Sequence, residues 1–151
     1  MTVIATQYGV LFADRTVSIG DTRVEMNKIL PAGGGTFAYT GNLTDVQHLV
    51  DCVMTKTPVS DHKDNCTLIW MKESGAWYYD ANHTGFKLDP NSVTIFGSER
   101  AISYVQVAMA SRGIGLEQAL IELCSHDKDF AGLDKVVGNN GEVINIVPWR
   151  Y

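Results

Sequence analysis

Apolar residues recur along the chain with two different spacings, which predict strands in some segments and helices in others. Residues 2–13 (TVIATQYGVLFA) are rich in β-branched and aromatic residues and predict a strand, and ADRT predicts a turn before a second strand at VSIGDTRVE. These two strands should form a hairpin. NKIL and TFAYTG predict two more strands joined by PAGGG. From Leu43 to about Thr55 the apolar positions fall on one helical face, and Thr44 with Gln47 predicts a capping box.

The second half of the chain repeats this alternation of strands and helices. The polar loop TPVSDHKDN (57–65) precedes the predicted strands CTLIWMK and AWYYDA, and SVTIFG is a further strand. Ser98 is the predicted N-cap of a helix that Gly113 ends, and GLEQALIELCSHD predicts the next helix. The last residues, DKVVGNNGEVINIVPWRY, predict two short strands joined at NNG.

This order of elements predicts the fold class. Two antiparallel sheets interrupted by helices bury one face against each other and the outer faces against helices. We therefore expect an α+β fold, a four-layer αββα sandwich, in a single domain over residues 1–151.

The composition and charge of the chain argue against several classes of binding partner. The chain has 151 residues, of which 45% are hydrophobic and 19% charged, as in ordinary globular proteins. Its net charge of -5 argues against nucleic acid or an anionic membrane as a partner. We expect a cytoplasmic location, because no membrane-spanning or signal segment is present. The three cysteines fit reduced core thiols, and no spacing indicates a metal or an organic cofactor.

Four short segments carry residues suited to nucleophilic catalysis. They are Thr2 at the head of the first strand, GDTR (20–23), NKI (27–29) and AYTG (38–41) before a helix. A threonine with a free α-amine contains both a nucleophile and a base of near-neutral pKa. A nearby lysine favours the alkoxide, an aspartate holds that lysine, and backbone amides at a strand-to-helix turn can bind an oxyanion.

With these segments in this order, the chain resembles a proteasome β-type subunit of the Ntn hydrolases, closest to the bacterial HslV-like members. TVIATQY resembles the opening strand, IGDTR the strand with the family's aspartate and arginine, NKI the catalytic lysine, AYTGNLTD the glycine turn, and VTIFGSERAISY the entry to a later helix. The resemblance implies a threonine peptidase without cofactor or metal. It also implies a homo-oligomeric ring or stacked rings and peptide or protein substrates, and it leaves open whether an unfoldase is a partner.

The resemblance assigns roles to individual residues. Thr2 would be the nucleophile and, through its amine, the base, while Asp21 would orient Lys28. Gly41 would donate its N–H to the oxyanion, and Ser98 would lie near the Thr2 amine.

Further expectations concern substrate binding and a supporting carboxylate. Tyr39 would line the pocket for the residue before the cleaved bond, and Glu25 occupies a position where the family commonly has a peptide-binding threonine. Asp127 or Asp129 would support the nucleophile, and Ala131 stands where the family has a serine.

Two functions remain open from the sequence. Removal of Met1 would free the Thr2 amine and allow a peptidase, whereas retention of Met1 would leave that nitrogen in an amide. The alternative is a non-catalytic structural or assembly subunit with the same fold, for instance in a phage particle, with particle proteins as partners and a virion location. Glu25, Ala131 and the loop in place of a second helix favour this alternative.

Overall fold

The computed structural model describes residues 1–57, 66–80, 85–139 and 141–151. The predicted loop at 57–65 therefore lies outside the described residues except for Thr57. Asn140, in the predicted NNG turn, also lies outside them.

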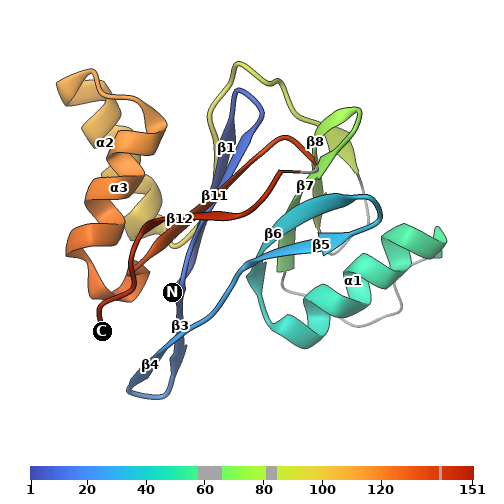
Figure 1. Cartoon of the computed structure of the whole chain (residues 1–151), viewed down its shortest axis with the longest axis horizontal. Helices are drawn as coiled ribbons and strands as arrows, with labels where there is room; N and C mark the ends of the chain where they lie inside the picture. Colours follow the sequence, from blue (N-terminus) through green and yellow to red (C-terminus); the bar gives the residue numbers. More distant parts are fainter. Residues whose placement is uncertain (58–65, 81–84, 140) are drawn as a thin grey trace.

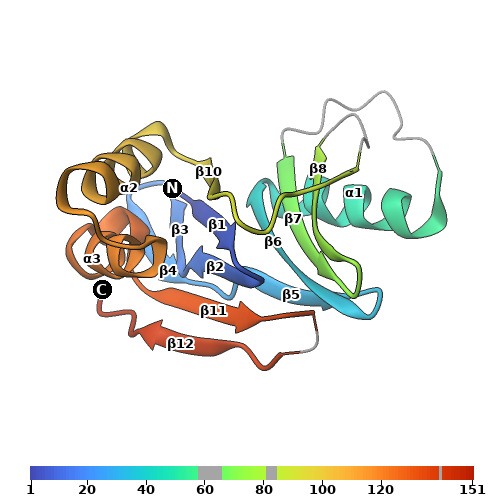
Figure 2. The same cartoon turned by 90° about the horizontal axis from the view of Figure 1, so that it is seen from above.

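In the described residues, two five-stranded antiparallel sheets and a two-stranded ribbon make up the β structure (Figures 1 and 2). The first sheet has the order β10 (Thr94–Gly97), β1 (Val3–Gln7), β2 (Val10–Asp14), β11 (Leu133–Val137), β12 (Ile144–Val147). The second has the order β5 (Ile29–Ala32), β6 (Gly35–Gly41), β7 (Cys66–Lys72), β8 (Gly75–Asp80), β9 (Phe86–Lys87). The ribbon pairs β3 (Thr16–Ile19) with β4 (Thr22–Glu25) and extends below both sheets in Figure 1.

The helices in the described residues lie at the two ends of the view in Figure 1. They are α1 (Leu43–Thr55), α2 (Glu99–Arg112) and α3 (Leu116–His126), and the 3-10 turn η1 (Lys128–Phe130) follows α3. Their bounds agree with the predicted helices. At α1, however, the side chain of Asn42 caps the Thr44 N–H, so the predicted capping box of Thr44 and Gln47 is replaced by an asparagine cap. No helix of the described residues is long and apolar enough to cross a membrane.

Three apolar clusters hold these elements together, and the alternation of side chains along β1 separates two of them. Val3 and Ala5 contribute to a cluster with α2 and α3, whereas Ile4 faces the opposite side. A second cluster joins α1 to the second sheet, through Leu49 and Trp70 among others. The third cluster contains residues of both large sheets: Ile4, Leu11, Ala13, Ile29, Ala38, Ile69, Met71 and Val136. The chain thus has a mixed α/β fold with both sheets packed against one another.

The first two predicted strands are each divided by a tight turn. Tyr8 and Gly9 have φ values of 53° and 74°, so residues 2–13 form the β1–β2 hairpin instead of one strand. Such a pair of positive φ angles suits a two-residue hairpin turn. VSIGDTRVE is likewise a hairpin of its own, turning at Gly20 and Asp21. As a result, Asp14 ends a strand of the first large sheet and Asp21 lies at the tip of the ribbon.

Candidate active site

A buried ion pair lies at the centre of the candidate site. The Nζ of Lys28 is 2.9 Å from Oδ2 and 3.0 Å from Oδ1 of Asp14, and the two side chains are 1% and 0% exposed. Asp14 also accepts the backbone N–H of Val3 at 2.9 Å and that of Thr16 at 3.1 Å. Burial raises the pKa of the Asp14 carboxyl, and Lys28 and the two N–H groups oppose this shift. Both carboxylate oxygens are therefore fixed by donors.

The prediction that Asp21 orients Lys28 is corrected by this geometry. Asp21 is exposed at the turn of the β3–β4 ribbon, and the carboxylate that contacts Lys28 is that of Asp14. The sequence carried a signal for the right residue, because VLFAD places an aspartate at the end of an apolar strand. A carboxylate in such a position requires a buried partner.

Lys28 also contacts the residue predicted to be the nucleophile. Its Nζ donates to Oγ1 of Thr2 at 3.0 Å and lies 3.4 Å from the carbonyl oxygen of Met1. An ammonium at this distance favours ionisation of the hydroxyl. Burial, followed by repulsion from Lys28, lowers the pKa of the Met1 α-amine. The environment at the start of β1 thus favours a neutral amine and a polarised hydroxyl.

Thr2 opens onto a cleft of about 530 Å³. Gly41 and Ser98, both predicted from the sequence, line it together with Thr2. The other lining residues are Met1, Thr40, Thr67, Phe96, Gly97 and Ile102. The cleft therefore combines hydroxyl groups, one aromatic ring and aliphatic surface next to the Thr2 hydroxyl.

The entry to α2 is fitted closely to Thr2. The Ser98 N–H donates to the carbonyl oxygen of Thr2 at 2.9 Å. Ser98 is the N-cap of α2, as predicted, but its side chain makes no capping hydrogen bond, and its Oγ lies 4.0 Å from the sulfur of Met1. A Cβ at Gly97 would lie 2.0 Å from the Thr2 carbonyl oxygen, and φ there is 129°, so this position requires glycine.

The two predicted substrate-binding residues lie elsewhere. Tyr39 is buried in the cluster beneath α1, and its hydroxyl lies 3.4 Å from the sulfur of Met26. Its neighbour Thr40 lines the cleft, because successive residues of a strand face opposite sides. Thr40, and not the predicted Tyr39, therefore lines the cleft beside Thr2. Glu25 forms a partly exposed ion pair with Arg15.

Of the two candidate supporting carboxylates, Asp129 lies where its charge reaches the N-terminal amine. It accepts hydrogen bonds from Arg23 at 2.8 Å and from Arg100 at 2.8 Å, and these donors lower its pKa. Asp127 pairs with Arg100 and caps the η1 turn. Ala131, at the predicted serine position, contributes its backbone oxygen to the Thr16 hydroxyl.

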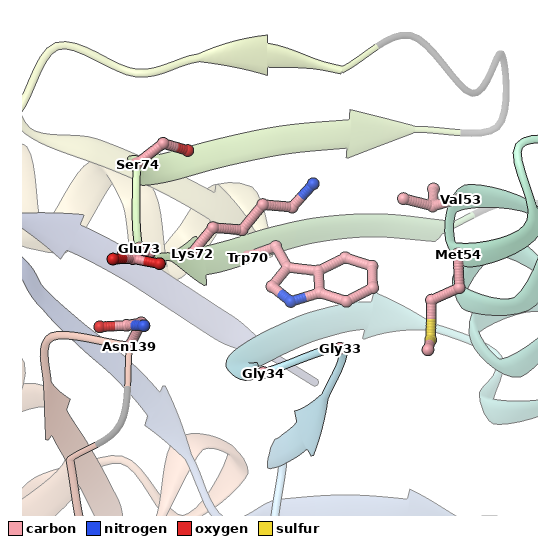
Figure 3. A pocket seen from close by; sticks show the side chains of 9 residues that line it. All are labelled: Gly33, Gly34, Val53, Met54, Trp70, Lys72, Glu73, Ser74 and Asn139. Atoms are coloured by element: carbon pink, nitrogen blue, oxygen red, sulfur yellow. The ribbon is translucent and has the colours of Figure 1, made fainter.

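A larger hollow of about 710 Å³ lies on another part of the surface (Figure 3). It is lined by Gly33, Gly34, Val53, Met54, Trp70, Lys72, Glu73, Ser74 and Asn139, none of which lines the Thr2 cleft. The Lys72 ammonium lies over the rings of Trp70, at 5.1 Å, and Tyr79, at 4.7 Å. In the part of the chain that the structure describes, no group of three or more His, Cys, Asp or Glu residues could hold a metal ion.

No protein-family model matches the chain, and no curated protein matches its sequence.

Solved structures do share its fold. An Anbu mutant from Hyphomicrobium sp. strain MC1 superposes with a TM-score of 0.65 at 12% identity, over 97% of this chain and 88% of that one. Eukaryotic HslV from Trypanosoma brucei gives a TM-score of 0.59 at 14% identity, over 95% and 98% of the two chains. The helical assembly of the Anbu complex from Pseudomonas aeruginosa gives 0.61 at 11% identity, over 97% and 87%. The chain therefore has the proteasome-like fold of Anbu and HslV.

Proposed function

We propose that the chain, once Met1 is removed, is a proteasome-like threonine peptidase that hydrolyses peptide bonds through an acyl-enzyme at Thr2. The observation that carries this proposal is the 3.0 Å contact between the Lys28 ammonium and the Thr2 hydroxyl. Asp14 holds that ammonium in place from a fully buried position. A hydroxyl at the head of a chain, beside a fixed cation, has the local chemistry of an activated nucleophile.

The reaction would use the Thr2 amine as its base. This amine accepts the proton of Oγ1 while Oγ1 attacks the substrate carbonyl carbon, and Lys28 stabilises the developing alkoxide. The amine proton then passes to the leaving amino group as the C–N bond breaks, which leaves an ester on Thr2. Water, deprotonated by the same amine, hydrolyses the ester and restores the hydroxyl. No metal or organic cofactor takes part.

Residues at the cleft would complete the site. Gly41 lies at the start of the turn into α1, where its N–H is proposed to bind the oxyanion. Ser98 is proposed to lie beside the freed amine, since its Oγ already lies near Met1. Asp129, held by Arg23 and Arg100, is proposed to stabilise that amine when it is protonated.

The proposals for the fold and the assembly rest on the structural similarity to Anbu and HslV. We infer that the three clusters correspond to a four-layer αββα sandwich forming one domain over residues 1–151. An Anbu complex forms a helical assembly, and the shared fold supports a homo-oligomer for this chain as well. Its peptide or protein substrates would reach Thr2 within that assembly.

The proposal is tested with protein whose first residue is Thr2, prepared by methionine removal and checked by intact mass. Small fluorogenic peptides should be hydrolysed, and a β-lactone, which acylates nucleophilic hydroxyls, should add its mass to Thr2. Thr2→Ala and Lys28→Ala should abolish both signals while circular dichroism shows a folded chain. Thr2→Ser keeps a hydroxyl and is the matched control. Hydrolysis that survives Thr2→Ala would refute the mechanism.

The structural alternative rests on the burial of the same ion pair. Asp14 and Lys28 tie β1, β2 and β5 together whether or not Met1 is present, so a non-catalytic assembly subunit would need them too. In that case the chain starting at Thr2 neither hydrolyses peptides nor reacts with the β-lactone. Thr2→Ala would then leave the oligomer unchanged.

A further inference from the structure

We propose that Trp149, in the segment after β12, is a positioning residue that holds the candidate catalytic ion pair in place through Thr16. This inference rests on the proposed function for its meaning in catalysis. Its structural basis is a continuous series of hydrogen bonds from the end of the sequence to its beginning.

The first part of the series fixes the Thr16 side chain. The indole Nε1 of Trp149 donates to Oγ1 of Thr16 at 3.0 Å, across 133 positions of sequence. The same hydroxyl donates to the backbone oxygen of Ala131 at 2.9 Å. Thr16 is fully buried. Its hydroxyl therefore has one acceptor and one donor, which together restrict its rotation.

The second part connects Thr16 to the ion pair. The Thr16 backbone N–H donates to Oδ2 of Asp14 at 3.1 Å, and Lys28 donates to the same oxygen at 2.9 Å. The intervening residue is held as well, since the Arg15 N–H donates to the Ala131 carbonyl at 3.1 Å. The corner between β2 and β3 is thus fixed on both sides.

Trp149 supplies an anchor of that corner from the C-terminal segment, in addition to the ion pair of Arg15 with Asp134 on β11. Without the indole donor, the Thr16 hydroxyl keeps its bond to Ala131 but loses its constraint from the C-terminal segment. The Thr16 N–H can then move relative to Asp14, and the Lys28 ammonium moves with the carboxylate. Because the Lys28 contact to Thr2 depends on distance, small shifts reduce the activation of the hydroxyl.

The test compares two tryptophan variants in protein that begins at Thr2. Trp149→Phe removes the donor to Thr16, whereas Trp77→Phe removes an indole donor to the exposed hydroxyl of Ser74. Loss of one net hydrogen bond changes an equilibrium constant by roughly three- to tenfold. We therefore expect the rate of Thr2 acylation by the β-lactone to fall by up to that factor in Trp149→Phe. Trp77→Phe should react at the wild-type rate.

A spectroscopic measurement separates positioning from general stability. The backbone N–H groups of Val3 and Thr16 both donate to Asp14, so their amide resonances report on that carboxylate. Trp149→Phe should shift both resonances, and Trp77→Phe should shift neither. Unchanged Val3 and Thr16 resonances in a folded Trp149→Phe variant would overturn the inference.

Substitutions at Thr16 keep the inference testable if Trp149→Phe does not fold. Thr16→Ser retains the hydroxyl and should keep the wild-type acylation rate, whereas Thr16→Val removes it and should slow acylation. Equal rates in the two variants would overturn the inference. If the wild-type chain is not acylated at all, the proposed function fails, and the Val3 and Thr16 resonances alone decide whether Trp149 positions Asp14.

Discussion

The backbone N–H of Val3 donates to Oδ1 of Asp14 at 2.9 Å, so the carboxylate that holds Lys28 also holds the strand that carries Thr2. Three segments of the chain therefore converge on one buried carboxylate. The backbone next to the candidate nucleophile and the cation beside that nucleophile are thus held by the same group.

This arrangement predicts a large cost for removing the carboxylate. Asp14→Asn leaves the buried Lys28 ammonium without its counterion and should lower the free energy of unfolding by about 3–5 kcal/mol. Asp21→Asn, at the exposed ribbon tip, should change it by less than about 0.5 kcal/mol. Urea unfolding followed by circular dichroism measures both. Equal costs would contradict the assignment of Asp14 as the partner of Lys28.

A double substitution tests whether the pair is needed for folding. Asp14→Leu combined with Lys28→Met removes both charges at similar volume, so no uncompensated charge stays buried. The double variant should be more stable than either single variant in the same unfolding assay. It should also be inactive toward peptides, since the cation beside Thr2 is gone. A double variant less stable than both singles would show that the two residues contribute independently.

The carboxylate of Asp129 predicts a pH-dependent contribution to stability. Hydrogen bonds from Arg100 and Arg23 lower its pKa below the ordinary 3.8. A carboxyl whose pKa is lower in the folded state than in the unfolded state stabilises the fold at pH values above its unfolded-state pKa. This contribution is lost as the pH falls through the folded-state pKa. Asp129→Asn should therefore reduce the free energy of unfolding by about 1 kcal/mol at neutral pH, and the difference from wild type should shrink below pH 3.8.

Asp21→Asn serves as the control, because Asp21 is exposed at the ribbon tip. A difference between wild type and Asp129→Asn that stays constant down to strongly acidic pH would contradict the ion-pair origin of this stability.

The close approach at the entry to α2 predicts a specific effect for glycine replacement. Gly97→Ala places a methyl group against the Thr2 carbonyl oxygen and strains a φ of 129°, which should cost about 2 kcal/mol or more. Gly113→Ala also has a positive φ, of 65°, but its Cβ would meet nothing within 4 Å. Thermal unfolding should therefore show a larger loss for Gly97→Ala. Reaction of Thr2 with the β-lactone should fall only in that variant.

Because Thr40 lines the cleft and Tyr39 does not, we expect Thr40 to have the larger influence on peptide hydrolysis. Thr40→Leu adds bulk to the cleft beside Gly41 and should reduce peptide hydrolysis by roughly tenfold, which corresponds to about 1.4 kcal/mol. Tyr39→Phe removes a hydroxyl that faces Met26 and should leave hydrolysis unchanged. Steady-state rates with one fluorogenic peptide compare the two variants. A larger effect at Tyr39 would restore the original assignment.

The helices and most strands could be predicted from the sequence because their signals are local. The apolar period from Leu43, the glycine after Arg112 and the run CTLIWMK each specify an element within a few residues. The first hairpins could not be predicted in the same way. The tight turn at Tyr8 and Gly9 depends on positive φ angles, whereas the composition of residues 2–13 indicates a continuous strand.

The sequence by itself indicated the candidates Thr2, Lys28 and Gly41, since the type and order of these residues already describe a nucleophile, a cation and a backbone donor, and the resemblance to proteasome β-type subunits added Ser98. Only the tertiary structure decided that Asp14 is the partner of Lys28. Several aspartates precede or follow this lysine, and which of them is buried beside it depends on strand register and on which face of the sheet is covered.

The same reason applies to Thr40 and to Trp149. Packing of α1 on one face of β6 buries Tyr39 and leaves Thr40 to the cleft. The contact of Trp149 with Thr16 joins residues 133 positions apart. Local sequence patterns specify helices and strands. The partner of a buried charge or hydrogen-bond donor, however, depends on which residues the complete fold brings within hydrogen-bonding distance.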